Sequence, residues 1–237
     1  VDLLLPSGAE NLNYVLYTDE SPYKMQREWL DRLPFDIYSV NVHTGAKRLI
    51  GRSYRTAPKW SVNGKWAVMY DPIAQVWNKF DGATGKVVNI SDAIGYPMFM
   101  ESYDKPAPAP AYGIAGWTAD GNNVFLYDAY DWWKIDLTGE RQPECLTKGY
   151  GRKHGKSIRK MTSNIDKDVF QKDEKVIVSL WDKDTMDEGV YQLDMKGRLR
   201  KLMEGNYVYT IHRFSDNHEY CVWNRQNVSE FRDLWWS

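Results

Sequence analysis

Apolar and polar residues alternate along most of this chain, and the same pattern returns several times. The stretches WSVNGKWAVMYD at 60–71 and WTADGNNVFLYD at 117–128 each open on tryptophan, pass a short turn with glycine, and alternate to Tyr-Asp. A period of two on both sides of an Asn-Gly or Asp-Gly turn predicts a β-hairpin. The same pattern recurs in FQKDEKVIVSLWD at 170–182, in FSDNHEYCVWN at 214–224 and, more loosely, at 3–19.

A second pattern follows each hairpin. It is a strand rich in aromatic residues, then a turn, then a more polar strand, at 36–50, 76–90, 132–146 and 190–203. Glycine supplies the positive φ that such turns need. The turn glycines are Gly45, Gly85, Gly139 and Gly197, and a last copy, DLWWS at 233–237, stops before its glycine.

Each repeat therefore predicts four antiparallel strands, which we name A to D. Four-stranded units repeated at this spacing indicate an all-β fold, a β-propeller segment of about four to five blades that is open or truncated. A β-sandwich also has many short strands, but it does not predict the repeated Trp-turn-Tyr-Asp pattern. The expected blades cover residues 3–50, 54–91, 112–147, 165–203 and an incomplete 207–237. The pairs Trp132-Trp133 and Trp235-Trp236 are expected to pack between blades, with ligand contact as the alternative.

One stretch has the pattern of a helix. In SPYKMQREWLDRLP at 21–34, Ser21 can cap, Pro22 suits the first turn and Pro34 ends the pattern. It lies between strands B and C of the first blade, so we expect an insertion and not a second domain.

The connections differ in length, which predicts where function lies. The A–B and C–D turns are short, whereas the B–C loops and blade connectors include the helix, the Pro-rich run 104–110, the basic run 148–160 and the acidic loop 182–188. Long loops on a rigid scaffold commonly carry function. We therefore expect these four segments on one face, with an interaction surface that includes Trp29, Tyr112, Tyr150, Arg152, Lys153 and Lys156.

Composition narrows the classes of partner. The chain has 237 residues, 43% apolar, and a net charge of −1, which gives no long-range attraction to nucleic acid or to an anionic membrane. No apolar run approaches the about 18 residues of a membrane span. The basic run 148–160 could bind nucleic acid with Tyr150 stacking, but without a recognition motif we expect a solvated connector. The start VDLLLPSG has neither an initiator Met nor a signal pattern, so we expect a piece of a longer protein.

Candidate chemistry is sparse. Asp71, Asp128 and Asp182 each follow a strand B; they could form a carboxylate cluster, but Asp at a strand end commonly bonds its own turn. His212 and His218 match no ligand spacing, and we expect no metal and no cofactor. Cys145 and Cys221 fall in different expected blades, so both thiols should be free.

The hairpins carry a resemblance. The pattern W-S/T-x-D/N-G-K, followed by D/N-x-x-T-G-K at the next turn, resembles the propeller of the prolyl oligopeptidase family of serine peptidases, a style shared with dipeptidyl peptidase IV, acylaminoacyl peptidase and TolB propellers. Residues 53–71 and 112–139 carry it best. The likeness covers roughly 3–237 and is more specific for a propeller than for one family.

The resemblance implies that this propeller is attached to a catalytic domain. In that family the propeller precedes an α/β-hydrolase domain with Ser, Asp and His, whereas this chain has no G-x-S-x-G nucleophile elbow and no Glu-Glu dipeptide. The implied function is a non-catalytic propeller that screens the active site and helps to select peptides, with the hydrolase domain of the same parent chain as its partner. A TolB-like scaffold for protein binding is the alternative. The family further implies a periplasmic or extracytoplasmic compartment.

Overall fold

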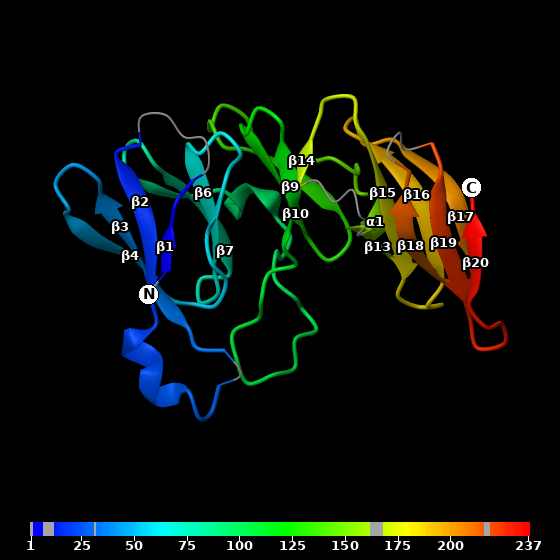
Figure 1. Cartoon of the computed structure of the whole chain (residues 1–237), viewed down its shortest axis with the longest axis horizontal. Coiled ribbons are helices and arrows are strands. Elements are labelled where there is room, and N and C mark those ends of the chain that lie inside the picture. The colour runs from blue at the N-terminus through cyan, green and yellow to red at the C-terminus, as the bar shows by residue number, and fades with distance from the viewer. Residues whose placement is uncertain (1, 7–11, 31, 162–167, 216–218) are drawn as a thin grey trace. The chain divides into compact units, whose positions relative to one another are not determined.

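The computed structural model describes residues 2–6, 12–30, 32–161, 168–215 and 219–237 (Figure 1). The chain divides into two compact units. Unit 1 comprises Val1–Gly113, Trp117–Val124 and Ile135–Glu144, and unit 2 comprises Ile114–Gly116, Phe125–Lys134 and Cys145–Ser237. The fold is all-β, a β-propeller segment of consecutive antiparallel sheets, as the alternation predicts.

Unit 1 contains two complete four-stranded sheets, each in the order of the chain. The first has strands β1 Asp2–Leu4, β2 Tyr14–Asp19, β3 Phe35–Asn41 and β4 Lys47–Tyr54. The second has strands β5 Lys59–Trp60, β6 Trp66–Asp71, β7 Val76–Asp81 and β8 Val87–Asn89.

The third sheet has five strands in the order β12-β11-β10-β9-β14, and residues of both units contribute to it. Its strands are β9 Ile114–Thr118, β10 Asn123–Tyr127, β11 Trp132–Asp136, β12 Glu144–Cys145 and β14 Val169–Phe170. We expected Phe170 to open the fourth sheet, so its place beside β9 differs from the sequence prediction.

The fourth sheet instead begins in the basic run. Its order is β13-β15-β16-β17, with β13 Lys156–Lys160, β15 Lys175–Asp182, β16 Glu188–Asp194 and β17 Leu199–Gly205. Strand β13 pairs with β15 over five residues, and Ile158 is fully buried. The expectation of a solvated connector through 160 is therefore wrong for this part, because its basic side chains reach acceptors outside the strand while Ile158 packs inward.

The last described sheet has three strands, β18 Val208–Phe214, β19 Cys221–Gln226 and β20 Asp233–Trp236, in that order. Residues 216 and 217 of its expected A–B turn, and His218, lie outside the described residues. Cys221 is on the second strand of this sheet and Cys145 on the edge strand β12, and both are free thiols.

Side-chain caps at the strand ends explain the recurring Asp and Asn. Asp71 Oδ1 accepts the N–H groups of Ile73 and Ala74 at 2.9 Å each, and Asp182 Oδ1 accepts those of Asp184 and Thr185. Asp128 Oδ1 does the same with Tyr130 and Asp131 at 2.7 and 2.6 Å. The prediction that these carboxylates bond their own turns is confirmed.

Within each unit, one pair of neighbouring sheets packs through apolar side chains. In unit 1 a core cluster joins the first sheet to the second, with Leu16, Phe35, Ile37, Tyr54, Ala67, Met69 and Phe80. In unit 2 Val190 packs with Tyr209, Ile211 and Trp223 of the last sheet. This sheet-on-sheet burial is what a blade needs to remain folded.

The tryptophan pairs have different surroundings. Trp132 is fully buried and lies against Phe125 and Phe170 of its own sheet, with ring centroids 6.3 and 6.1 Å away. It also donates through Nε1 to the carbonyl of Ile158 in the fourth sheet at 3.1 Å, so the predicted contact between blades is present for this residue. Trp235 stacks on Trp223 but is 43% exposed, and Trp236 is 75% exposed. The predicted packing between blades is therefore wrong for Trp236, because this residue lies exposed on the edge strand of its sheet.

Helices are short. The predicted helix 21–34 is wrong in extent: among the described residues of this stretch only η1, Ser21–Gln26, is helical, as a 3-10 helix without a buried residue. Without an apolar stripe packed on the sheet, a longer helix lacks stabilisation. The others are η2, Asp92–Ile94, and α1, Tyr150–Lys153. Among the described residues no helix is long and apolar enough to cross a membrane.

Candidate binding surface at the loop ends of the sheets

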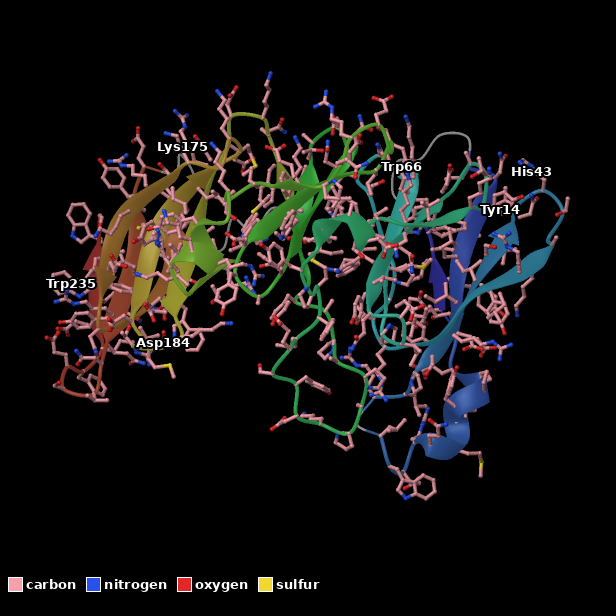
Figure 2. The ribbon with its side chains drawn as sticks, turned by 180° about the vertical axis from the view of Figure 1, so that it is seen from behind. Tyr14, His43, Trp66, Lys175, Asp184 and Trp235 are labelled. Atoms are coloured by element: carbon pink, nitrogen blue, oxygen red, sulfur yellow. The ribbon has the colours of Figure 1, made fainter. Side chains whose placement is uncertain are left out.

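Antiparallel strands give every sheet two different ends. We call the end with the A–B and C–D turns the turn end, and the end from which the B–C loop leaves the loop end. Figure 2 places Tyr14, His43 and Trp66 at the turn end of unit 1, away from η1. There Asn13 donates through Nδ2 to the carbonyl of Ala83 at 3.0 Å, so the turns of neighbouring sheets are bonded.

Both long segments of unit 1 lie at its loop end. η1 follows β2 directly, and residues 90–113 leave after β8, whose Asn89 pairs with Asn78 near the start of β7. Figure 1 shows η1 in blue and this connector in green extending from the same side of the two sheets. Tyr70 Oη donates to the carbonyl of Ala109 at 3.1 Å and holds the Pro-rich run there.

The long segments of unit 2 also share an end. Lys156 at the start of β13 pairs with Asp182 at the end of β15, so residues 150–155 lie beside the turn 183–187. The turn 227–232 between β19 and β20 is found at this same end in Figure 1. The prediction of a shared face thus holds within each unit; across the two units it stays a prediction.

Two buried carboxylates build the loop end of unit 2. Asp131, 1% exposed, accepts from Thr147 Oγ1 at 2.6 Å and from the N–H groups of Gly151 and Arg152 at 2.9 and 3.0 Å, which fixes the start of α1. Asp128, fully buried, accepts from Arg152 Nη2 and Trp133 Nε1 at 3.0 Å each. A buried carboxylate with several donors is a rigid support.

A tyrosine ring lies between two cations on this support. Lys183 Nζ is 4.0 Å from the Tyr130 ring centroid and Arg152 Cζ is 5.0 Å from it. Such contacts contribute about 0.5–1 kcal/mol each at exposed sites. The arrangement places guanidinium and ammonium groups at the surface around an aromatic ring, which suits carboxylates and polar peptide groups.

Lys156 has an acidic partner. Its ammonium bonds the carboxylate of Glu204, and this hydrogen bond raises the pKa of Lys156 and lowers the pKa of Glu204. Beside them, burial raises the pKa of the Tyr191 phenol, with Glu204 and Tyr150 acting in the same direction. Tyr150 also packs on His154, with ring centroids 4.2 Å apart.

The six residues expected at an interaction surface fall into two groups. Tyr150, Arg152, Lys153 and Lys156 come together at the loop end of unit 2, on α1 and at the start of β13. Trp29 and Tyr112 belong to unit 1, where Trp29 is 79% exposed and Tyr112 Oη accepts the Glu101 N–H at 3.3 Å.

The sequence interpretation missed Tyr130, Asp131 and Lys183. The signal for Tyr130 and Asp131 lay in the spacing YDAYD at 127–131, where a second Asp follows the turn-forming Asp128, whereas Lys183 had no such signal. The use of Asp131 as a cap for α1 depends on a segment twenty residues later, which the pattern does not reveal.

Comparison with known proteins finds similar structures but does not assign the chain to a family. No family model matches the chain, and no curated protein matches it. Among solved structures it is similar to TolB from Acinetobacter baumannii, with 14% identity and a TM-score of 0.44, over 98% of this chain and 56% of that one.

Similar values relate the chain to peptidases. A structure from a study of two prolyl endopeptidases shares 12% identity at a TM-score of 0.48, over 99% of this chain and 34% of that one. The acylaminoacyl peptidase of Pyrococcus horikoshii shares 12% at 0.41, over 99% and 38%. The chain thus spans about half of TolB and just over a third of these peptidases. Similarity at this level identifies no family. The assignment of the fold depends instead on the sheets observed in the chain itself.

Proposed function

We propose that this chain is the non-catalytic propeller segment of a prolyl-oligopeptidase-like serine peptidase, and that it acts by binding. Its loop ends would meet the peptide substrate or the α/β-hydrolase domain of the parent chain, screen the active site and contribute to selection of peptides. Fold alone does not establish this role, so the proposal depends on the site.

The observation that carries the proposal is the set of structured connections at the loop ends. There η1, the connector 90–113, α1 and the turn 183–187 leave the sheets, whereas most turns at the turn ends are short and closed by Asx and glycine geometry. The A–B connections 5–13 and 161–174 are longer exceptions at the turn ends. Buried Asp128 and Asp131 hold Arg152 in place, so its guanidinium group is preorganised.

The test compares two pairs of charge reversals in the parent protein. Lys153→Glu with Lys156→Glu changes the loop end of unit 2, and Lys65→Glu with Lys86→Glu changes the turn end of unit 1 as a matched control. We expect the first pair to change kcat/KM for peptides at least about fivefold, and the second to leave it within about twofold. Equal effects of the two pairs would contradict the proposal.

A second readout concerns the chain alone. It should hydrolyse no peptide or ester and should not react with a serine-directed fluorophosphonate probe, since it has no nucleophile elbow. Labelling that survives removal of contaminants would contradict a non-catalytic role. A G-x-S-x-G motif in the parent sequence after Ser237, followed by Asp and His, would support the peptidase parent.

The same geometry supports a second function, a TolB-like scaffold that binds another protein. The observation that favours it is the exposure of large apolar side chains at the loops, such as Met186 at 62% and Phe231 at 93%. A parent sequence without the G-x-S-x-G motif would favour the protein-binding scaffold over the peptidase propeller.

A further inference from the structure

A hollow of about 320 Å³ lies at the turn end of unit 1, where the first sheet meets the C–D turn of the second. Figure 2 shows Tyr14 and His43 at this end. The residues that line the hollow are Tyr14, Ser39, Asn41, Thr44, Ala46, Lys47, Arg48 and Thr84. Ser39, 1% exposed, is the most buried of them. Cavities that bind small molecules begin at about 300 Å³, so this hollow has room for a small organic molecule.

Arg48 provides the positive charge inside the hollow. Its Nη2 donates to the carbonyl of Gly85, which fixes the guanidinium group between the two sheets. Among the described residues no carboxylate pairs with Arg48. A guanidinium has five N–H donors, and the carbonyl oxygen of Gly85 engages only one of them. The other donors and the uncompensated charge are therefore available to an anion.

The neutral polar groups beside Arg48 are left mainly with hydrogens to donate. Asn41 Oδ1 accepts two N–H groups of its own turn at 3.0 Å each, and Thr44 Oγ1 accepts that of Ala46 at 3.2 Å. Thr84 Oγ1 likewise accepts the N–H of Lys86 at 3.4 Å. The side-chain amide hydrogens of Asn41 and the hydroxyl hydrogens of both threonines have no acceptor in the described part of the chain. Several donors around one cation suit the oxygens of an oxyanion.

The other charged groups of the two C–D turns and their strand ends leave this region positive. Lys47 Nζ lies over two tyrosine rings, 4.3 and 4.1 Å from their centroids, so it adds positive charge beside Arg48. Lys86 adds a second such charge. The acid there, Asp81, accepts two N–H groups of its own turn at 2.8 and 3.2 Å. Glu10, in the preceding A–B connection, lies outside the described residues. Three cations against one capped carboxylate favour a negatively charged ligand.

We propose that this hollow binds a small organic anion through a phosphate or carboxylate group. Arg48 would donate to the oxygens of that group, and Asn41, Thr44 and Thr84 would donate to the same oxygens or to hydroxyl groups next to them. The site lies at the turn end of unit 1. It is therefore separate from the loop-end surfaces of the proposed function and does not depend on them.

The test records ¹H–¹⁵N spectra of the full chain during addition of glycerol 3-phosphate, of glycerate and, as the neutral comparison, of glycerol. We expect both anions to shift the backbone amide signals of residues 41–48 and 84 until the site is saturated, and glycerol to leave these signals in place. The anion with the lower Kd identifies which acidic group the hollow prefers. Added NaCl should raise both Kd values, because salt screens exposed charges.

Arg48→Gln removes the charge and keeps a side-chain N–H that can donate to Gly85. The matched control is Arg52→Gln, since Arg52 is exposed on the same strand, β4, and does not line the hollow. We expect Arg48→Gln to raise both Kd values at least about tenfold and Arg52→Gln to leave them within about twofold. Thr84→Val, which changes no charge, should raise them about two- to fivefold and tests the site even if Arg48→Gln lowers the Tm.

Three results would overturn the inference. They are no saturable shift with either anion, shifts with glycerol as large as those with the anions, and equal Kd values for Arg48→Gln and Arg52→Gln. Each leaves the Lys153 and Lys156 test of the proposed function standing, because that test changes the loop end of unit 2.

Discussion

Many turns among the described residues are closed by one Asn or Asp side chain, whose Oδ1 accepts backbone N–H groups of the turn. Asn41 and Asp81, at equivalent C–D turns, each accept two N–H groups from the residues that follow. Asx geometry tolerates either residue. The same side-chain hydrogen bonds thus recur from turn to turn. The turns differ in which residues of a neighbouring turn contact them.

Gly121 shows how close such a contact can be. Its φ is +68°, and a Cβ there would lie 2.6 Å from Asn63 Cγ and 2.8 Å from the backbone N of Asn63. We expect Gly121→Ala to lower the free energy of unfolding by ~2–4 kcal/mol, from backbone strain plus the clash.

Gly45→Ala is the matched control, since its φ is +71° with nothing within 4 Å of a Cβ. Strain alone should cost ~1 kcal/mol there. Denaturant titration of both variants measures the difference, and equal losses would show that Asn63 moves aside freely.

The ion pair of Lys156 and Glu204 predicts a pH dependence. Because the folded-state pKa of Glu204 is lowered, its contribution is present above the unfolded pKa and is lost as pH falls through the folded pKa. Because the pKa of Lys156 is raised, its contribution is present below the unfolded pKa and is lost as pH rises through the folded pKa.

Glu204→Gln removes the first of these. The stability difference between wild type and Glu204→Gln should shrink as pH falls from about 6 to about 3. Denaturant titrations across this range measure it, with Glu140→Gln at an exposed turn as the control. A difference that does not change with pH would mean that the pair contributes through packing alone.

At element scale, the anchoring of η1 decides the shape of one loop end. Tyr23 Oη donates to Asp36 Oδ1 at 2.5 Å, and Asp36, 5% exposed, also accepts the N–H of Ser53 at 3.1 Å. No residue of η1 itself is buried. One hydrogen bond to a buried carboxylate is thus a main attachment of this element to its sheet.

Tyr23→Phe should release η1 without unfolding the sheet. Loss of the donor leaves the buried Asp36 with fewer partners, at a cost of ~1–3 kcal/mol. We expect faster trypsin cleavage after Lys24 and Arg27, followed by mass spectrometry. Tyr96→Phe, at an exposed site elsewhere in unit 1, should leave cleavage unchanged. An unaltered rate in Tyr23→Phe would show that η1 is held by other contacts.

At the scale of the whole molecule, the stability of the sheets depends on apolar contacts with a neighbouring sheet, as between the first and second and between the fourth and fifth. The last described sheet differs from the others because it has three strands, and every residue of its edge strand β20 is exposed. An exposed, apolar strand edge is a site for pairing with another chain.

We therefore expect association that rises with concentration and depends on β20. Trp236→Lys, at a 75% exposed site, should shift sedimentation velocity profiles toward the monomer without lowering the Tm. Val42→Lys on a C–D turn serves as control. Association unchanged by Trp236→Lys would place the contact elsewhere.

The local pattern was sufficient for the repeat. Alternation with a period of two, divided by turn residues, predicts the strands of the first two sheets and the carboxylate caps at Asp71, Asp128 and Asp182. These features depend on neighbours in sequence, such as Asp71 bonding Ile73 and Ala74. Local geometry of this kind is determined by a few adjacent residues.

Which strand pairs with which could be decided only from the tertiary structure. Lys156–Lys160 and Val169–Phe170 both suit a strand, but only one can pair with β15, and the longer β13 does so over five residues while β14 joins β9. Likewise the pattern at 21–34 suits a helix, yet Met25 and Trp29 stay exposed, and among the described residues of this stretch only Ser21–Gln26 is helical. Such choices compare the burial and hydrogen bonds of whole elements, and these energies arise between residues far apart along the chain.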